Sequence, residues 1–274
     1  MAAAKEGIKQ KVRGWSHHDS ADLYGIDDWG NGYFRISKKG EVTVRLNDED
    51  GGKKDVSLCD LLEGLKERGT TVPVLFRFRD LLRSRIAELN DSFRKAIKEA
   101  GYQGKYQGVY PIKVNQQRQV VEEIAEFGTK YDYGLEAGSK PELIAAMAHM
   151  HNPNAYLICN GYKDDEFIDL ALTAQKMGLN IFIVLEMPSE LDVILERARR
   201  MDIRPNLGVR VKLAAKGSGL WQESAGDKSV FGLNAAQVVD VVDKLKQVDA
   251  LDCFFSPATS PPGHRLSPPL PGRG

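Results

Sequence analysis

Short apolar runs alternate with amphipathic stretches from Val72 onward, and this rhythm constrains the fold more than any other feature of the sequence. We expect strands at residues 72–78, 108–113, 133–136, 155–160, 180–186 and 207–213. We expect helices between and after them, at 79–100, 116–127, 140–149, 164–177, 189–200 and 235–247. Crossovers of this length join parallel strands, and several of the strands are apolar throughout, which is typical of a sheet buried on both faces. The pattern predicts an α/β protein with a parallel sheet.

Six consecutive β/α units fit either a barrel or a doubly wound sheet, and periodicity alone does not separate the two. Polar or charged residues recur at or near the predicted strand C-termini: Lys113, Asn115, Glu136, Asn160, Glu186 and Arg210. A barrel assembles its site from many strand ends, whereas an open sheet concentrates its ligand at one switch point. We therefore favour a truncated parallel (β/α)8-type barrel of about six of the eight units, with the start of a seventh at 251–255.

The pattern divides the chain into four parts. We expect a disordered N-terminus (1–14), an N-terminal β/α segment (15–70), a partial barrel (71–253) and a proline-rich tail (254–274). Within the second part we predict a hairpin at 33–37 and 41–46, a charged loop at 47–55 and a helix near 58–68. The tail holds six of the twelve prolines. It is either disordered or, as we favour, translated out of frame, because it interrupts an expected strand.

Composition excludes several classes of protein. Lys plus Arg and Asp plus Glu number 38 each, so no overall field favours nucleic acid. No segment approaches the roughly 18 apolar residues of a membrane helix, and the N-terminus lacks the apolar core of a signal peptide. The three cysteines are far apart, which argues against a disulfide framework and a zinc site. We expect a soluble, cytoplasmic protein with no nucleic-acid or membrane partner.

Lys113 is the first candidate for chemistry, because it ends a predicted buried strand. Low-dielectric surroundings would disfavour its ammonium form, and a neutral amine is what reacts with an aldehyde cofactor. The alternative, which position alone favours, is a solvated lysine at a strand end. The glycine-rich run at 216–228 is compatible with a phosphate cradle or a mobile active-site loop, but it lacks GxGxxG or Walker spacing.

Two further strand ends carry charges that a cofactor site can use. Glu136 can orient a lysine or balance charge near a cofactor, whereas a capping box from Ser139 to Glu142 explains its neighbours without any function. Arg210 keeps its charge, so inside a barrel it must meet an acid or an anion. Gly161 is expected to let the turn after Asn160 bend.

Longer runs resemble one family, the biosynthetic, bacterial and plant-type arginine decarboxylases. The runs are SADLYGIDDWGNGYF at 20–34, GKYQGVYPIKVNQQRQVVEE at 104–123, YGLEAGSKPEL at 133–143, ICNGYKD at 158–164, LGVRV at 207–211 and KGSG at 216–219. The resemblance covers about residues 15–253, and runs of this length are far more specific than any single motif.

The resemblance implies a fold-III pyridoxal-phosphate enzyme in which residues 15–70 belong to the family's β-domain. It implies that Lys113 carries the cofactor, that Glu136 is the acid near that lysine, and that Arg210 lies close to the pyridine ring. The implied reaction converts L-arginine to agmatine and CO2 for polyamine biosynthesis. The implied cofactors are pyridoxal 5'-phosphate and Mg2+, and the implied assembly is a homo-oligomer.

The family continues beyond Cys253 into elements that this chain lacks. They are a strand with His-x-Gly-Ser, glycine-rich phosphate-binding turns, the acid opposite the pyridine nitrogen and a C-terminal β-domain. We therefore expect the chain to be an N-terminal portion that is poorly folded or inactive alone. The alternatives are a related decarboxylase of diaminopimelate or ornithine, and a non-catalytic fragment that binds a full-length subunit.

Overall fold

The computed structural model describes residues 14–47, 52–212 and 231–254, in two compact units that divide between Arg85 and Ile86. The expectations for residues 1–13, for the glycine-rich run and for the tail from residue 255 lie outside the described residues.

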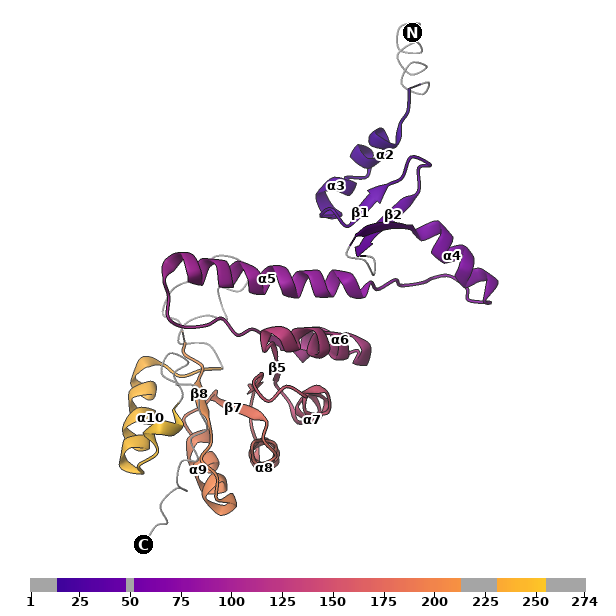
Figure 1. Ribbon diagram of the computed structural model, residues 1–274. Coiled ribbons are helices and arrows are strands. Elements are labelled where there is room, and N and C mark those ends of the chain that lie inside the picture. The colour runs from indigo at the N-terminus through magenta and orange to yellow at the C-terminus, as the bar shows by residue number, and fades with distance from the viewer. Residues whose placement is uncertain (1–13, 48–51, 213–230, 255–274) are drawn as a thin grey trace, which may run out of the picture. The chain divides into compact units, whose positions relative to one another are not determined.

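A three-stranded antiparallel sheet forms the centre of the first unit (Figure 1). Its strands are β1 (Phe34–Ile36), β2 (Val42–Asn47) and β3 (Lys53–Ser57). Its helices are α2 (His17–Leu23), α3 (Ile26–Trp29) and α4 (Leu58–Glu67). The predicted hairpin and the helix near 58–68 are confirmed. The predicted loop at 47–55 is wrong in its second half, because Lys53, Lys54 and Asp55 pair with β2.

The strand predicted at 72–78 is wrong. This segment is the short apolar run of a buried strand, yet it pairs with no strand among the described residues. Val72 and Leu75 are 74% and 73% exposed in consequence. A β pattern becomes a strand only where a second strand satisfies its backbone groups.

The second unit contains a sheet of five parallel strands in chain order. The strands are β4 (Val109–Pro111), β5 (Gly134–Ala137), β6 (Tyr156–Cys159), β7 (Asn180–Leu185) and β8 (Leu207–Val209). The helices are α5 (Arg79–Ala100), which begins in the first unit, α6 (Arg118–Gly128), α7 (Lys140–His149), α8 (Asp165–Lys176), α9 (Glu190–Met201) and α10 (Ala235–Gln247). Helices α6 to α10 lie in an arc around the strands (Figure 1). The α/β class and these predicted helices are confirmed.

The described strands do not close into a barrel, and five β/α units are present where six were predicted. The seventh start expected at 251–255 appears as a 3₁₀ turn, η5 (Leu251–Cys253), followed by a parallel bridge from Phe254 to Leu207. The bridge lies beside β8, at the free edge of the sheet. It marks the position where the next parallel strand would pair.

The core of the second unit lies between the sheet and its helices. Leu135, Leu157 and Ile183 come from three neighbouring strands and are fully buried, and Phe167 packs with them from α8. Burying a side chain of this size contributes about 1.5–3 kcal/mol. Helix α8 begins where it does because the Asp164 carboxylate accepts the Phe167 N–H at 2.9 Å.

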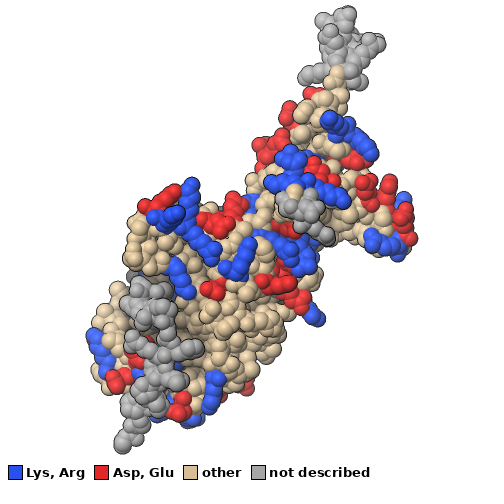
Figure 2. All heavy atoms as spheres, in the orientation of Figure 1, with Lys and Arg blue, Asp and Glu red and all other residues tan. Residues whose placement is uncertain are grey.

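The surface carries both signs of charge. Figure 2 shows acidic and basic side chains interspersed over the visible face, in keeping with the balanced composition. Within the described part of the chain, no helix is both long and apolar enough to cross a membrane.

Candidate functional site

The strand C-termini of the second unit meet at an open hollow of about 650 Å³. Residues from the ends of all five strands line it, and they include Lys113, Glu136, Asn160, Glu186 and Arg210. Five of the six polar strand-end residues singled out in the sequence therefore come together in space. Asn115 is not among the lining residues, and Glu142 was not predicted to be one.

Lys113 is exposed, so the expectation of low-dielectric surroundings is wrong in this structure. Strand β4 already ends at Pro111, and the chain continues through a 3₁₀ turn, η1 (Ile112–Val114). This turn buries Ile112 and leaves Lys113 at the solvent side of the hollow. The amine is therefore accessible to a small molecule that enters the hollow.

Glu136 is buried at the end of the neighbouring strand. It pairs in register with Pro111 of β4, and its Oε1 accepts a hydrogen bond from Asn160 Nδ2 at 3.2 Å. Its carboxylate therefore lies beside the strand from which Lys113 emerges. The amide of Asn160 holds it in place from β6.

Glu142 also belongs to the site. Ser139 is the N-cap of α7, as predicted, but its side chain makes no capping hydrogen bond, so the predicted capping box is wrong. The Glu142 carboxylate instead accepts the Gly138 N–H at 2.7 Å and Gln116 Nε2 at 3.1 Å. The signal in the sequence was its place in the first turn of a helix that follows a strand end.

Arg210 pairs with an acid, although its exposed side chain does not require one. That acid is Glu186, which is buried at the end of β7 and lies 3.4 Å from Arg210 Nη1. The Arg210 side chain is 55% exposed, and its guanidinium lies 5.5 Å from the centre of the Phe231 ring. An N···O separation of 3.4 Å makes a weak hydrogen bond, so most of the exposed guanidinium can still bind an anion in the hollow.

The turn after Asn160 requires glycine, as the sequence indicated. Gly161 has a φ of +75°, and a Cβ there would lie 2.4 Å from the carbonyl oxygen of Gly138. The two turns that follow β5 and β6 are therefore in close contact, and a side chain at Gly161 would force them apart. Its N–H donates to Glu186 Oε1 at 3.0 Å, which joins a third strand end to the same point.

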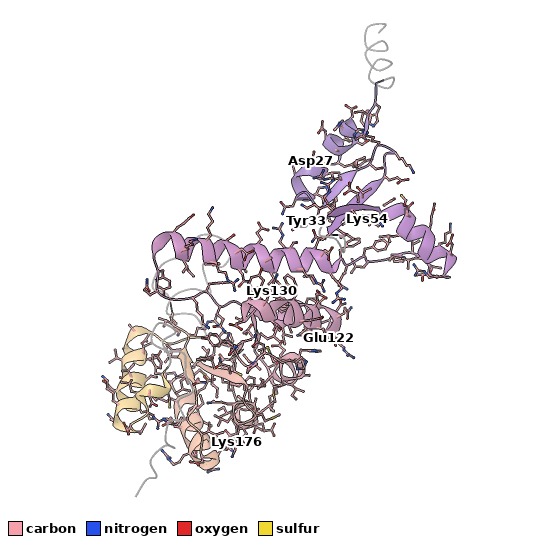
Figure 3. The ribbon with its side chains drawn as sticks, viewed as in Figure 1. Asp27, Tyr33, Lys54, Glu122, Lys130 and Lys176 are labelled. Atoms are coloured by element: carbon pink, nitrogen blue, oxygen red, sulfur yellow. The ribbon has the colours of Figure 1, made fainter. Side chains whose placement is uncertain are left out.

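A second hollow, of about 780 Å³, lies away from the strand ends. Its lining includes Arg118, Glu122 and His149 from α6 and α7, and Figure 3 labels Glu122 on α6. Within the described ranges, no group of three His, Cys, Asp or Glu side chains is arranged to hold a metal ion.

Known proteins resemble this chain in sequence and in structure. The family described as "Pyridoxal-dependent decarboxylase, pyridoxal binding domain" matches residues 84–254. A biosynthetic arginine decarboxylase of Gloeobacter violaceus is 49% identical over 240 residues, which cover 88% of this chain and 37% of that protein. Arginine decarboxylase 1 of Oryza sativa is 47% identical over 263 residues, with 92% and 38% covered.

A solved structure is similar over the same region. The biosynthetic arginine decarboxylase of Campylobacter jejuni matches with a TM-score of 0.71 at 34% identity, over 84% of this chain and 36% of that one. The chain thus spans about 37% of the length of the curated relatives that it matches.

Proposed function

The chain belongs to the pyridoxal-dependent decarboxylases, and from this premise we propose that it forms part of the cofactor site of an arginine decarboxylase. The proposed reaction converts L-arginine to agmatine and CO2 and feeds polyamine biosynthesis. The observation that supports it best is the single hollow in which Lys113, Glu136 and Arg210 come together from three strand ends.

The hollow fits pyridoxal phosphate in its donor set. It offers an accessible amine at Lys113, a buried carboxylate at Glu136 and a partly open guanidinium at Arg210. When bound, the cofactor supplies a sink for the electron pair that remains on the α-carbon as CO2 leaves.

The three side chains take different roles in this proposal. Lys113 would hold the cofactor through its Nζ amine, and the same amine would be placed to accept or donate a proton. Glu136, held by Asn160, places a negative charge beside that lysine. Arg210 supplies a fixed positive charge at the opposite end of the sheet edge, steadied by Glu186.

Magnesium, a homo-oligomer and a cytoplasmic location complete the proposal. Each follows from the resemblance to arginine decarboxylases, and none has a residue of this chain assigned to it. Metal removal with a chelator and sedimentation of the purified protein test the first two.

Borohydride trapping of pyridoxal phosphate on the 274-residue chain tests the cofactor site. We expect reduction to fix the cofactor on Lys113, found by peptide mass spectrometry, and the visible absorbance of the bound cofactor to vanish in Lys113→Ala. Lys176→Ala is the matched control, because Lys176 is exposed in the last turn of α8 and is not among the residues that line the hollow (Figure 3). Labelling of other lysines with none on Lys113 would contradict the proposal.

Substrate choice is tested separately. Incubation with L-arginine, L-ornithine or diaminopimelate, each followed by measurement of CO2 and of the amine product, is expected to show release from arginine alone. Release from ornithine or diaminopimelate with none from arginine would replace the proposed substrate and leave the cofactor site intact.

A further inference from the structure

Three charged side chains are buried together beside the hollow, where β6 and β7 end, and one of them, Glu186, lines the hollow. The side chains of Lys163 and Glu186 have no exposed surface, and that of Glu190 is 3% exposed. Removing charges from water is costly unless each is paired and hydrogen-bonded. The contacts within this group show what the arrangement holds in place.

Lys163 makes its shortest contact with the backbone rather than with an acid. Its Nζ donates to the Gly161 carbonyl at 2.6 Å, while the Glu190 carboxylate oxygens lie at 3.4 and 3.5 Å. Burial lowers the pKa of Lys163, and Glu190 opposes that shift. The Lys163 side chain therefore holds the Gly161 turn, which lines the hollow, through a hydrogen bond to its carbonyl.

Glu190 holds the other side of the group. Its carboxylate accepts the N–H of Glu186 at 2.8 Å, of Met187 at 3.4 Å and of Lys163 at 3.2 Å. These bonds set the backbone at the point where β7 gives way to α9. The Glu186 side chain starts from this backbone.

The Glu186 side chain connects the Gly161 turn to Arg210. Its Oε1 accepts the Gly161 N–H at 3.0 Å and faces Arg210 Nη1 at 3.4 Å. Both peptide groups of the glycine turn are thus held, the carbonyl by Lys163 and the N–H by Glu186. The same carboxylate therefore contacts both the Gly161 turn and the Arg210 guanidinium that lines the hollow.

We infer that Lys163 is a positioning residue of the site. It fixes the Gly161 turn directly and, through Glu190, fixes Glu186 and hence the place of Arg210 at the hollow. The effect on pyridoxal phosphate rests on the proposed function, whereas the effect on the turn does not.

Three variants test whether Lys163 positions the Gly161 turn or only balances the charge of Glu190. Lys163→Met removes the ammonium, and Lys163→Met with Glu190→Gln removes both charges so that no unpaired ion is buried. Lys140→Met is the matched control, because it removes an ion-paired lysine of the same unit that bonds Asp164 and Glu166 outside the hollow. Melting temperature, hydrogen exchange of peptides covering 160–163 and 185–187, and the dissociation constant of pyridoxal phosphate are measured for each.

We expect the double variant to recover the melting temperature lost in Lys163→Met but not the slow exchange of the Gly161 amide. Its exchange should stay about tenfold faster than in the wild type, the effect of losing the hydrogen bond from Lys163 to the Gly161 carbonyl. The dissociation constant of pyridoxal phosphate should rise about tenfold with it. Lys140→Met should leave both quantities unchanged.

Recovery of wild-type exchange in the double variant would overturn the inference, because Lys163 would then serve only to balance Glu190. Fast exchange with unchanged cofactor affinity would overturn its link to the site. If the wild-type chain takes no cofactor onto Lys113, the proposed function fails, and the exchange rates still decide whether Lys163 positions the turn.

Discussion

The two units bury their side chains in different ways. Among the described residues of the first unit, Ile26 and Val44 are the large apolar side chains that are buried, and its sheet is antiparallel. In the second unit, a parallel sheet and its helices enclose one continuous apolar cluster. Among the described residues, the buried charged side chains also belong to the second unit: Glu123, Glu136, Lys163, Glu186 and Glu190.

Truncating a core side chain should give the largest difference in unfolding free energy between the two units. Phe167→Ala is expected to cost the second unit about 3–5 kcal/mol of unfolding free energy, whereas Val44→Ala should cost the first about 2 kcal/mol. Urea titration, with hydrogen exchange read on peptides of each unit, measures both losses. Equal losses would show that the first unit is packed as tightly as the second.

A pair of glycines gives the next largest difference. Gly161 and Gly40 both have positive φ, but a Cβ at Gly40 would meet nothing within 4 Å. Gly161→Ala should cost about 3 kcal/mol, because a clash with the Gly138 carbonyl adds to the backbone strain, and Gly40→Ala about 1 kcal/mol. Similar values in the same urea titration would remove the argument that the two turns of the hollow must be in contact.

Helix caps should cost the same in both units. The Ser57 hydroxyl accepts the N–H of Cys59 and of Asp60 at the start of α4, and Asp164 caps α8. We expect Ser57→Ala and Asp164→Ala to cost about 1 kcal/mol each, because a cap acts on one exposed helix end and not on the core. A much larger loss for Asp164→Ala, seen by the same exchange measurement, would mean that its bond to Lys140 contributes more than exposed ion pairs usually do.

The smallest effect concerns an ion pair of the first unit. The hydrogen bond from Arg45 lowers the pKa of Asp55 in the folded state. Its contribution is therefore present above the unfolded pKa and is lost as pH falls through the folded value. Both side chains are partly exposed, so Asp55→Asn should cost less than about 1 kcal/mol at neutral pH and nothing in strong acid. A cost that does not change with pH would point to strand pairing rather than charge.

The elements of the second unit were predictable because their periodicity is local. Helices α5 to α10 and strands β4 to β8 lie within a few residues of their predicted places, since each pattern is complete within one segment. Strand β3 was missed because Lys53 and Lys54 face solvent and read as a loop. The segment 72–78 was overpredicted because strand formation depends on a partner that its own residues do not specify.

A site residue could be predicted from the sequence only where it stands at the end of a predicted strand. Lys113, Glu136 and Arg210 end strands, and parallel strands bring such ends to one edge. Glu142 and Lys163 were missed because a cap or a loop explained them locally. The partner of Lys163, Glu190, lies 27 residues further along the chain, and no local pattern joins the two.

The strand order of the second unit bears on how the protein is made. Each strand pairs with the strand just before it in the chain, from β4 through β8, so every pairing closes a short loop around one helix. Parallel pairing is slow, because each crossover must close before its two strands meet, but polypeptides are synthesised from the N-terminus and each pairing here needs only strands that have already been made. The sheet can therefore grow strand by strand as the chain leaves the ribosome. Lys113 follows β4, the first strand of this sheet, so it is in place at the sheet edge before the other residues of the site are synthesised.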